Sequence, residues 1–281
     1  MTVALAIREA AAALAGVSDT PRLDAELLMA HVLGLKRSEM LLRAMRDPVP
    51  EGIARLVVRR LAHEPVAYIV GRQEFYGLDL LVTPAVLIPR GDSETLLEAA
   101  RSAFAAPPRR VLDLGLGSGA LLLAALSMWP GAQGVGVESS LAAVAVAAAN
   151  AGLLGLAGRA RLLRRDWNAP DWRDDLGRFD LILANPPYVE DDAPLAPSLR
   201  DYEPAQALFA GPAGLEAYRA LVPQLHALLA PRGVALVEIG HTQADAVSAL
   251  ATQAGLSATL HRDLAGRPRA LEFKKALGKA G

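Results

Sequence analysis

Two short stretches of the sequence contain residues whose types and spacing can do chemistry. The first is Asn185-Pro186-Pro187-Tyr188, which directly follows the apolar run 179–184. Neither proline can donate a hydrogen bond to a sheet ladder, so these residues end the run rather than continue it. Taken alone, they would be interpreted as an ordinary turn. Their side-chain and carbonyl oxygens can also accept hydrogen bonds from an NH2 group.

The second stretch is VLDLGLGSGA at 111–120, where three glycines separate an expected strand from the helix that follows it. Glycine adopts positive φ without strain and lets the backbone approach a ligand closely. Glu138 ends the next expected strand, 21 residues after Gly117. A carboxylate there can accept hydrogen bonds from both hydroxyls of a ribose. A tight turn usually needs only one glycine, so the pattern favours a ligand that contains a ribose.

The spacing alone does not distinguish two such ligands. Gly115, Gly117 and Ala120 also fit the dinucleotide pattern GxGxxA, and both NAD and S-adenosylmethionine contain an adenosine ribose. Asp166 and Trp167 follow the third strand, where adenine could lie against the indole and donate its amino group to the carboxylate. These residues and the Asn-Pro-Pro-Tyr stretch together favour S-adenosylmethionine.

A methyl donor at these strand ends would give the Asn-Pro-Pro-Tyr stretch a purpose. A planar NH2 group is a poor nucleophile because its lone pair is delocalised. The Asn185 side-chain oxygen and the Pro186 carbonyl could accept its two hydrogens, and the prolines would keep these acceptors in place. Tyr188 could pack against the flat amide or base. Proton loss can follow methyl transfer, so no general base is required.

The elements that must position these residues alternate between strand and helix. Strands are expected at 110–115, 134–138, 160–166, 179–184 and 233–240, with helices between them and two closing strands at about 257–262 and 269–275. Such alternation predicts an α/β fold with a seven-stranded, mostly parallel sheet covered by helices on both faces. Because ligands bind beyond the carboxyl ends of such strands, the residues above should converge.

The chain before residue 65 is predicted to be helical, with Thr20 as an N-cap, Pro21 at the first helical position and Gly34 as a stop. We therefore predict three parts. Residues 1–64 form a helical substrate-recognition domain, 65–90 a hairpin linker, and 91–281 a methyltransferase domain.

Composition excludes several classes of site and partner. There are no cysteines, and the five histidines are scattered, so no disulfide, thiolate nucleophile or metal site is expected. The net charge of -1 argues against stable nucleic-acid binding. Arg8 and Glu9 interrupt the apolar N-terminus, which favours an amphipathic helix over a signal peptide. No membrane span is expected, and the default location is cytoplasmic.

These motifs, in order, resemble the peptide chain release factor glutamine N5-methyltransferases of the HemK type, which have a Rossmann-like class I methyltransferase domain. The resemblance extends over almost the full length through PRLDAELLMAHVLG, PVAYIVGRQEFYG, LIPRGDSE, DLGLGSGA, RDWNAP, NPPYV and YEPAQALFAGPAGLEAYR. It implies methyl transfer from S-adenosylmethionine to the glutamine amide in the Gly-Gly-Gln loop of release factors. The expected partners are these factors, and the expected state is a monomer without a metal.

The resemblance also implies roles for individual residues. The expected cofactor-binding residues are Asp113, Gly115, Leu116, Gly117, Ser118, Gly119, Glu138, Asp166, Trp167 and Asn185. Asn185, Pro186, Pro187 and Tyr188 are expected to be catalytic and to bind the acceptor, with Phe75 and Arg90 shaping the pocket entrance. The family usually has proline and threonine where Gly91 and Ser93 stand, and often threonine at Leu116, so cofactor affinity and loop rigidity are open.

Other functions remain open on sequence grounds. A close relative methylates a glutamine of ribosomal protein L3, but Asp92 and Glu94 after the IPR segment favour the release-factor branch. DNA and RNA amino-group methyltransferases share the motif pair and usually carry a basic recognition region. Residues 1–72 hold ten Lys or Arg and eight Asp or Glu, an excess of only +2. A nicotinamide-dependent oxidoreductase would leave Asn185 to Tyr188 unexplained, and a binding protein without activity is the last alternative.

Overall fold

The computed structural model describes residues 1–276, which form two compact units. One unit comprises Met1–Arg72 with Leu195–Tyr202, and the other comprises 73–194 with 203–276. The short segment Leu195–Tyr202 thus packs with the N-terminal residues, although it lies far from them in sequence. Its Tyr202 hydroxyl donates a hydrogen bond to the carbonyl of Ala62 at 2.7 Å.

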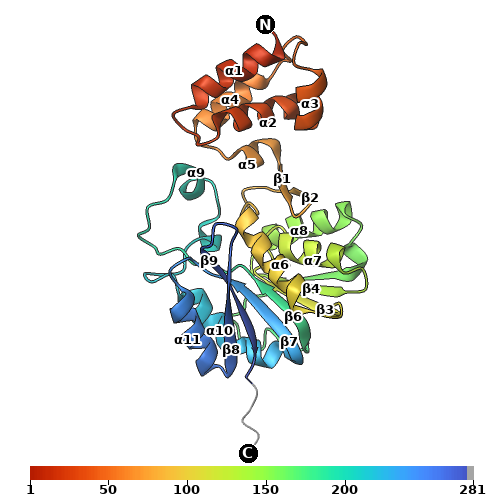
Figure 1. Cartoon of the computed structure of the whole chain (residues 1–281), viewed down its shortest axis with the longest axis vertical. Helices are drawn as coiled ribbons and strands as arrows, with labels where there is room; N and C mark the ends of the chain where they lie inside the picture. Colours follow the sequence, from red (N-terminus) through yellow and green to blue (C-terminus); the bar gives the residue numbers. More distant parts are fainter. Residues whose placement is uncertain (277–281) are drawn as a thin grey trace, which may run out of the picture. The chain divides into compact units, whose positions relative to one another are not determined.

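The first unit is a small helical bundle (Figure 1). Its helices are α1 (Val3–Leu14), α2 (Pro21–Leu33), α3 (Arg37–Arg43), α4 (Ile53–Leu61), α5 (Val66–Val70) and α9 (Pro197–Arg200). Apolar residues at three- and four-residue spacing on α1 and α2 meet in its core, which includes Val3, Ile7, Leu28, Met29 and Met40. The predicted helical character of this region is confirmed.

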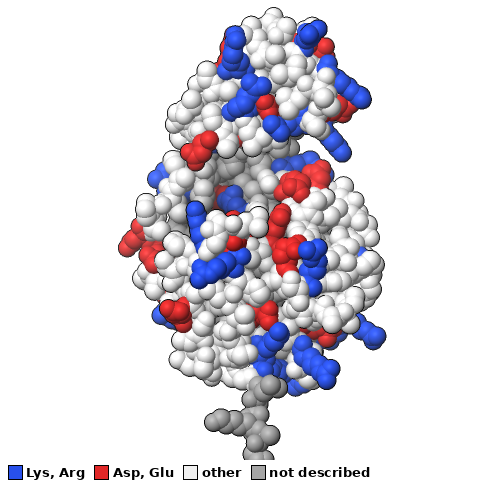
Figure 2. Space-filling view, viewed as in Figure 1, with Lys and Arg blue, Asp and Glu red and all other residues white. Residues whose placement is uncertain are grey.

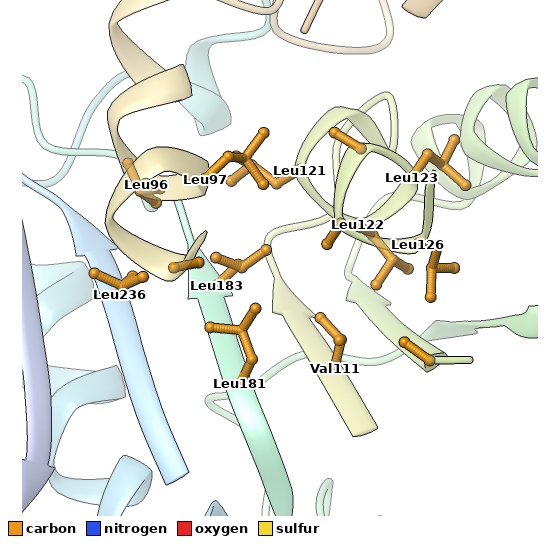
Figure 3. Close-up of a cluster of buried hydrophobic side chains, with 14 of the residues drawn as sticks. Leu96, Leu97, Val111, Leu121, Leu122, Leu123, Leu126, Leu181, Leu183 and Leu236 are labelled. Atoms are coloured by element: carbon orange, nitrogen blue, oxygen red, sulfur yellow. The ribbon is translucent and has the colours of Figure 1, made fainter. Parts of the chain in front are cut away.

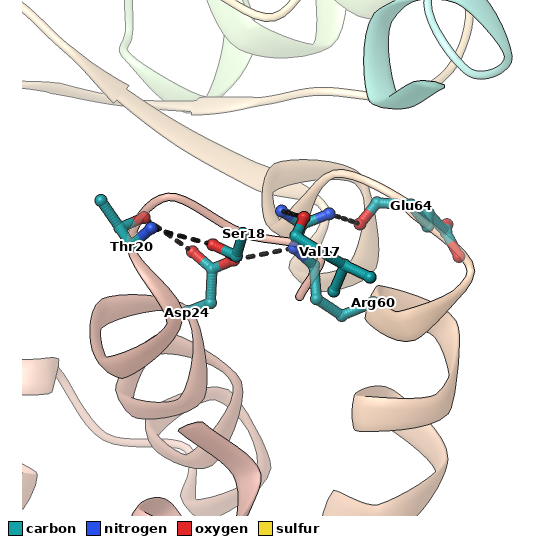
Figure 4. A network of polar contacts seen from close by, with 6 residues as sticks. All are labelled: Val17, Ser18, Thr20, Asp24, Arg60 and Glu64. Atoms are coloured by element: carbon teal, nitrogen blue, oxygen red, sulfur yellow. Dashed lines mark hydrogen bonds and ion pairs between the residues drawn. The ribbon is translucent and has the colours of Figure 1, made fainter. Parts of the chain in front are cut away.

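A buried ion pair ties the start of α2 to the end of α4 (Figure 4). The Asp24 carboxylate accepts from Arg60 Nε at 2.7 Å and from the Ser18 hydroxyl at 2.7 Å. Thr20 stands at the N-cap position, but its hydroxyl donates to Asp24 at 3.2 Å and does not cap the backbone. The prediction that Thr20 is the N-cap residue is confirmed, with Asp24 rather than a backbone N–H as the partner of its hydroxyl. Pro21 and Gly34 begin and end α2 as expected.

The second unit contains a seven-stranded sheet with strand order β5-β4-β3-β6-β7-β9-β8 (Figure 1). The strands are β3 (Arg110–Leu114), β4 (Gln133–Glu138), β5 (Ala160–Arg164), β6 (Phe179–Ala184), β7 (Leu229–Glu238), β8 (Leu256–Arg262) and β9 (Pro268–Lys275). Strand β9 runs in the opposite direction to the other six strands of this sheet. The predicted seven-stranded, mostly parallel sheet is confirmed.

Helices cover both faces of the sheet. They are α6 (Glu94–Ala103), α7 (Ala120–Met128) and α8 (Leu141–Leu153) on one face, with α10 (Glu216–Leu228) and α11 (Ala244–Gln253) on the other. Short 3-10 turns lie at Gly91–Ser93, Ala157–Arg159 and Ala205–Ala207. Residues 65–90, predicted as a hairpin, contain α5, the paired strands β1 (Arg72–Phe75) and β2 (Leu78–Leu81), and an irregular stretch before Gly91.

Alternate residues of each central strand enter opposite cores. Leu181 and Leu183 of β6 pack toward α6 and α7, as Figure 3 shows, while Ile182 between them faces α10. Both sets are fully buried, which explains why the central strands are continuous apolar runs in the sequence. The two cores pack against opposite faces of the sheet and hold its strand ends in place.

Within the described residues, no helix is long and apolar enough to cross a membrane.

Replacing Arg60 with Met should destabilise the first unit by about 3 kcal/mol, because it leaves the buried Asp24 carboxylate without its cation. Urea denaturation followed by circular dichroism measures the loss. The matched control is Arg43→Met, since Arg43 pairs with Glu39 on the surface, with its own side chain 79% exposed. That pair should contribute under about 1 kcal/mol. Equal effects of the two substitutions would contradict the importance of the buried pair.

Candidate functional site

The carboxyl ends of β3, β4 and β6 and the loop after β5 surround a cavity of about 420 Å³. Its lining includes, from the residues predicted to bind a cofactor, Gly115, Gly117, Glu138, Asp166, Trp167 and Asn185, and also Pro187. The convergence predicted from the strand order is therefore present. Residues near Phe209 and Ala210, in the loop before α10, complete the wall.

The glycine loop needs its glycines for conformation. Gly115, Gly117 and Gly119 have φ of 82°, 52° and 85°, in the left-handed region that other residues rarely adopt. A Cβ on Gly119 would also lie 3.0 Å from Leu123 Cδ1. Ser118 is buried, and its carbonyl accepts a hydrogen bond from Asn150. The loop is thus a fixed concave surface of backbone.

Leu116 faces inward from this loop. It lies 3% exposed in the core and fits over Gly136 of β4, where a Cβ would come within 2.6 Å of Leu116 Cδ1. The missing side chain at Gly136 leaves the space that this leucine fills. Gly136 therefore makes room for a leucine at position 116. The Leu116 side chain also lines a second, smaller cavity.

Backbone amides hold the Glu138 carboxylate at the end of β4. One oxygen accepts from the N–H of Gly117 at 3.0 Å and the other from the N–H of Ser140 at 2.9 Å. The second oxygen also accepts from the Ser139 hydroxyl at 3.3 Å. The first accepts only from Gly117 among the described residues, so it has a lone pair for a ligand hydroxyl. Glu138 is preorganised between the glycine loop and α8.

Trp167 and Asp166 lie in the loop after β5. A Cβ on Gly115 would be 3.4 Å from the Trp167 ring, so the indole lies against the glycine loop. The Trp167 carbonyl accepts from Gln224 at 3.0 Å, and Gln224 also accepts from the Trp172 indole N–H at 2.6 Å. Asp166 is exposed and accepts the side-chain and backbone N–H groups of Asn168.

The smaller cavity has a volume of about 60 Å³ and shares Leu87, Gly115, Gly117 and Asn185 with the larger one. Its other lining residues are Phe75, Pro89, Ser93, Asp113, Leu116, Ser118, Ala120 and Leu121. Asn185 therefore lies where the two cavities meet. Apart from Ser93, Asp113, Ser118 and Asn185, the lining side chains are apolar, which suits a small planar group.

The remaining predicted residues lie around these cavities. Pro186 is buried directly after Asn185, and Tyr188 points its hydroxyl at Glu238 rather than into either cavity. Arg90 forms an ion pair with Glu203, whose side chain is 1% exposed and whose second oxygen accepts from the Ile88 N–H at 3.2 Å. Arg90 therefore anchors the segment beside the smaller cavity.

Sequence reasoning missed several residues that hold the site together. Glu203 and Glu238 are buried carboxylates, and Asn150 bonds both the Leu81 backbone and the Ser118 carbonyl. Gln243 donates to the carbonyl of Tyr188 at 3.1 Å and so braces the Asn-Pro-Pro-Tyr stretch. Asn150 lies in α8 and Glu238 ends β7, whereas Glu203 and Gln243 lie in loops, and each has a partner that is distant in sequence. Within the described chain, no group of three or more His, Asp or Glu side chains could hold a metal ion.

Asp113 is the most deeply buried acid in the site. Its side chain accepts from the N–H of Leu122 at 3.1 Å through one oxygen, while the other oxygen has no partner within the described protein. Burial, with a smaller contribution from the charge of Glu138, raises the pKa of Asp113 from 3.8 to about 8. The carboxyl is therefore largely neutral at pH 7 and has an oxygen free to meet a ligand.

The raised pKa of Asp113 makes stability depend on pH. Below about pH 4 both folded and unfolded states bind its proton, and between pH 4 and 8 only the folded state does. The wild type should therefore lose about 1 kcal/mol per pH unit relative to Asp113→Asn as the pH rises through this window. Urea denaturation of both proteins at pH 5, 6, 7 and 8 measures the difference. A constant difference in unfolding free energy would show that burial does not shift this group.

Comparisons with known proteins agree with this architecture. Residues 6–71 match the family model "PrmC N-terminal domain" and residues 91–198 match "Methyltransferase small domain". A methyltransferase structure from Pyrococcus furiosus superimposes with a TM-score of 0.53, covering 80% of this chain and all of that one, at 17% identity. That likeness supports the class I methyltransferase fold.

Two curated relatives carry the name release factor glutamine methyltransferase. The protein from Rhodospirillum rubrum is 43% identical over 264 residues, 92% of this chain and 80% of the relative. The protein from Moorella thermoacetica is 40% identical over 277 residues, 96% of this chain and 97% of the relative. Similarity of this extent includes the helical unit, the glycine loop and the Asn-Pro-Pro-Tyr stretch together. The chain belongs to the release factor glutamine methyltransferase family.

Proposed function

We propose that this protein transfers a methyl group from S-adenosylmethionine to the side-chain amide nitrogen of the glutamine in the Gly-Gly-Gln motif of peptide chain release factors. The observation that carries the proposal is the position of Asn185, where the larger cavity of about 420 Å³ meets a small, largely apolar one. Family membership supports the reaction and the substrate class. We further expect a monomer that acts in the cytoplasm.

The larger cavity fits S-adenosylmethionine. Glu138, held by two backbone amides, would accept the ribose hydroxyls, and Trp167 and Asp166 would contact adenine. The glycine loop would receive the methionine part, where Gly115 and Gly117 line the larger cavity. When bound, the cofactor supplies an electrophilic methyl group on a sulfonium sulfur.

The smaller cavity would bind the acceptor amide. Asn185 Oδ1 would accept one amide hydrogen and the Pro186 carbonyl the other, which fixes the nitrogen and directs its lone pair toward the larger cavity. These acceptors belong to a segment whose neighbours are bonded on both sides, since Val189 exchanges two backbone hydrogen bonds with Leu208 and Ala210. Such preorganisation lowers the barrier, because the acceptors need no rearrangement during the reaction.

The surroundings of the acceptor also suit loss of charge. The sulfonium charge disappears as the methyl group moves, so an apolar wall favours the transition state over the charged ground state. Phe75, Leu87 and Pro89 supply that wall. None of the residues that line either cavity is a histidine. The amide can lose its extra proton to solvent after transfer, so the site needs no base.

A nucleic-acid substrate is less well supported. The net charge is -1, and on the face in Figure 2 acidic and basic groups are interspersed rather than gathered in one basic patch. The L3-type alternative would use the same pocket for a glutamine of another protein. An oxidoreductase would have no use for an Asn185 placed between two cavities. These features favour release factors as the methyl acceptor.

The Asn185→Ala variant should lose methyl transfer by about a hundredfold or more, because one preorganised acceptor is removed from the reacting group. Its affinity for S-adenosylmethionine, measured by calorimetry, should stay close to that of the wild type. Glu138→Ala is the complementary control, in which cofactor affinity falls. Wild-type turnover of the Asn185 variant would refute the acceptor role.

The substrate class is tested by incubation with labelled S-adenosylmethionine and, separately, a release factor, its Gly-Gly-Gln to Gly-Gly-Ala variant, ribosomal protein L3 and nucleic acid. We expect one added methyl group on the release-factor glutamine, located by mass spectrometry, and none on the alanine variant. Label confined to L3 or to nucleic acid would overturn the assignment.

A further inference from the structure

A chain of buried hydrogen bonds runs from Asn185 through Ser93, which also lines the smaller cavity, to Glu238. Asn185 Nδ2 is 3.1 Å from Ser93 Oγ, and Ser93 Oγ is 2.5 Å from Glu238 Oε2. The Tyr188 hydroxyl lies 3.3 Å from the other Glu238 oxygen. Ser93 and Glu238 are 4% and 1% exposed. Nothing in the proposed reaction so far uses these two residues.

The fold brings the three residues together from separate elements. Parallel pairing aligns Ala184 of β6 with Val237 of β7, so Asn185 and Glu238 are neighbours one step further along the strands. Ser93 ends the 3-10 turn that precedes α6, and its N–H bonds the carbonyl of Arg90. The position of Ser93 is therefore coupled to the Arg90–Glu203 ion pair beside the smaller cavity.

The chemistry of the acceptors sets the direction of each hydrogen bond. An ionised carboxylate only accepts, so Ser93 must donate its one hydrogen to Glu238, and Tyr188 must do the same. The Ser93 oxygen then has only lone pairs left for Asn185. Asn185 must turn its NH2 group toward Ser93, and its Oδ1 faces the opposite way. A bond to a charged acceptor is stronger than a neutral one, so the arrangement is well fixed.

We propose that Ser93 and Glu238 are positioning residues that hold the Asn185 side chain with its oxygen, not its NH2 group, toward the acceptor. The inference rests on the proposed function, in which Asn185 Oδ1 accepts from the substrate amide. A reversed side chain would present two N–H groups to the N–H groups of the substrate. The amide would then be repelled from its reactive position.

The charge on Glu238 couples this device to pH. Burial raises the pKa of Glu238 from 4.5 to about 7, against the opposing effects of the Ser93 and Tyr188 hydrogen bonds and of the Arg269 charge. Asp92 also faces it, beside Arg269 at 2.8 Å, and the Tyr218 hydroxyl donates to the Glu238 carbonyl. A protonated Glu238 can donate to Ser93, which frees the serine hydrogen to turn toward Asn185. The orientation of Asn185 is then no longer fixed.

The experiment compares turnover of the release factor by Ser93→Ala, Ser93→Thr and Glu238→Gln, with Ser102→Ala as the matched control. Ser102 is exposed on α6, and its hydroxyl donates to the Glu98 carbonyl at 2.9 Å. We expect Ser93→Ala to lower kcat by about tenfold to a hundredfold, as loss of a supporting hydrogen bond typically does. Ser93→Thr keeps the hydroxyl and should stay within about twofold of the wild type.

The pH profile separates positioning from mere structural support. Wild-type kcat should rise as the pH increases through about 7, the pKa of Glu238. Glu238→Gln cannot ionise, so its kcat should lack this rise. Cofactor affinity and the thermal midpoint of Ser93→Ala are measured alongside. A loss of kcat with both unchanged supports positioning, and a parallel loss of all three assigns Ser93 a structural role and overturns the inference.

The outcome also distinguishes this inference from the proposed function. If Asn185→Ala is inactive while Ser93→Ala and Glu238→Gln keep wild-type kcat and pH dependence, the inference fails and the acceptor site stands. If Asn185→Ala itself retains turnover, the acceptor site fails and the inference falls with it.

Discussion

Parallel pairing of β4, β3, β6 and β7 is the constraint on which the site depends. The pairing aligns Leu114 with Val137 and with Ala184, and Ala184 with Val237. One residue follows each of these aligned positions, and these four residues must meet at one edge of the sheet. They are Gly115, Glu138, Asn185 and Glu238. Two apolar cores fix the strands from both faces and so keep the spacing of the residues at the four strand ends.

Burial gives the site its particular electrostatics. Asp113 and Glu238 are both 1% exposed, and burial raises the pKa of each toward neutrality. Such groups destabilise a core. A buried acid either loses the hydration of its charge or must bind a proton that it would not hold in water. Their presence near Asn185 fits the general observation that functional sites retain polar groups at the expense of stability. The rest of the sheet, with its continuous apolar strands, offsets that cost.

Much of this arrangement could be predicted from the sequence, because it depends on patterns formed by residues close together in the chain. Alternation of strand and helix gave the sheet, and Gly115, Gly117 and Glu138 marked the larger cavity by spacing. Thr20 was predicted as the N-cap of α2 from a position preference and occupies that position, but such a preference cannot show that its hydroxyl donates to Asp24.

Residues that support the site could not be found in this way, for a physical reason. Ser93 and Glu238 are bonded to each other across 145 positions, and Asn150 bonds Leu81 across 69 positions. No local window of sequence contains both members of either pair. Their value comes from burial, which only the folded chain reveals. The contrast has a consequence for specificity. Spacing led to the proposal that Asn185 meets a planar amide, but the hydrogen bonds that we propose to orient its side chain reach across the sheet and have no local signal in the sequence.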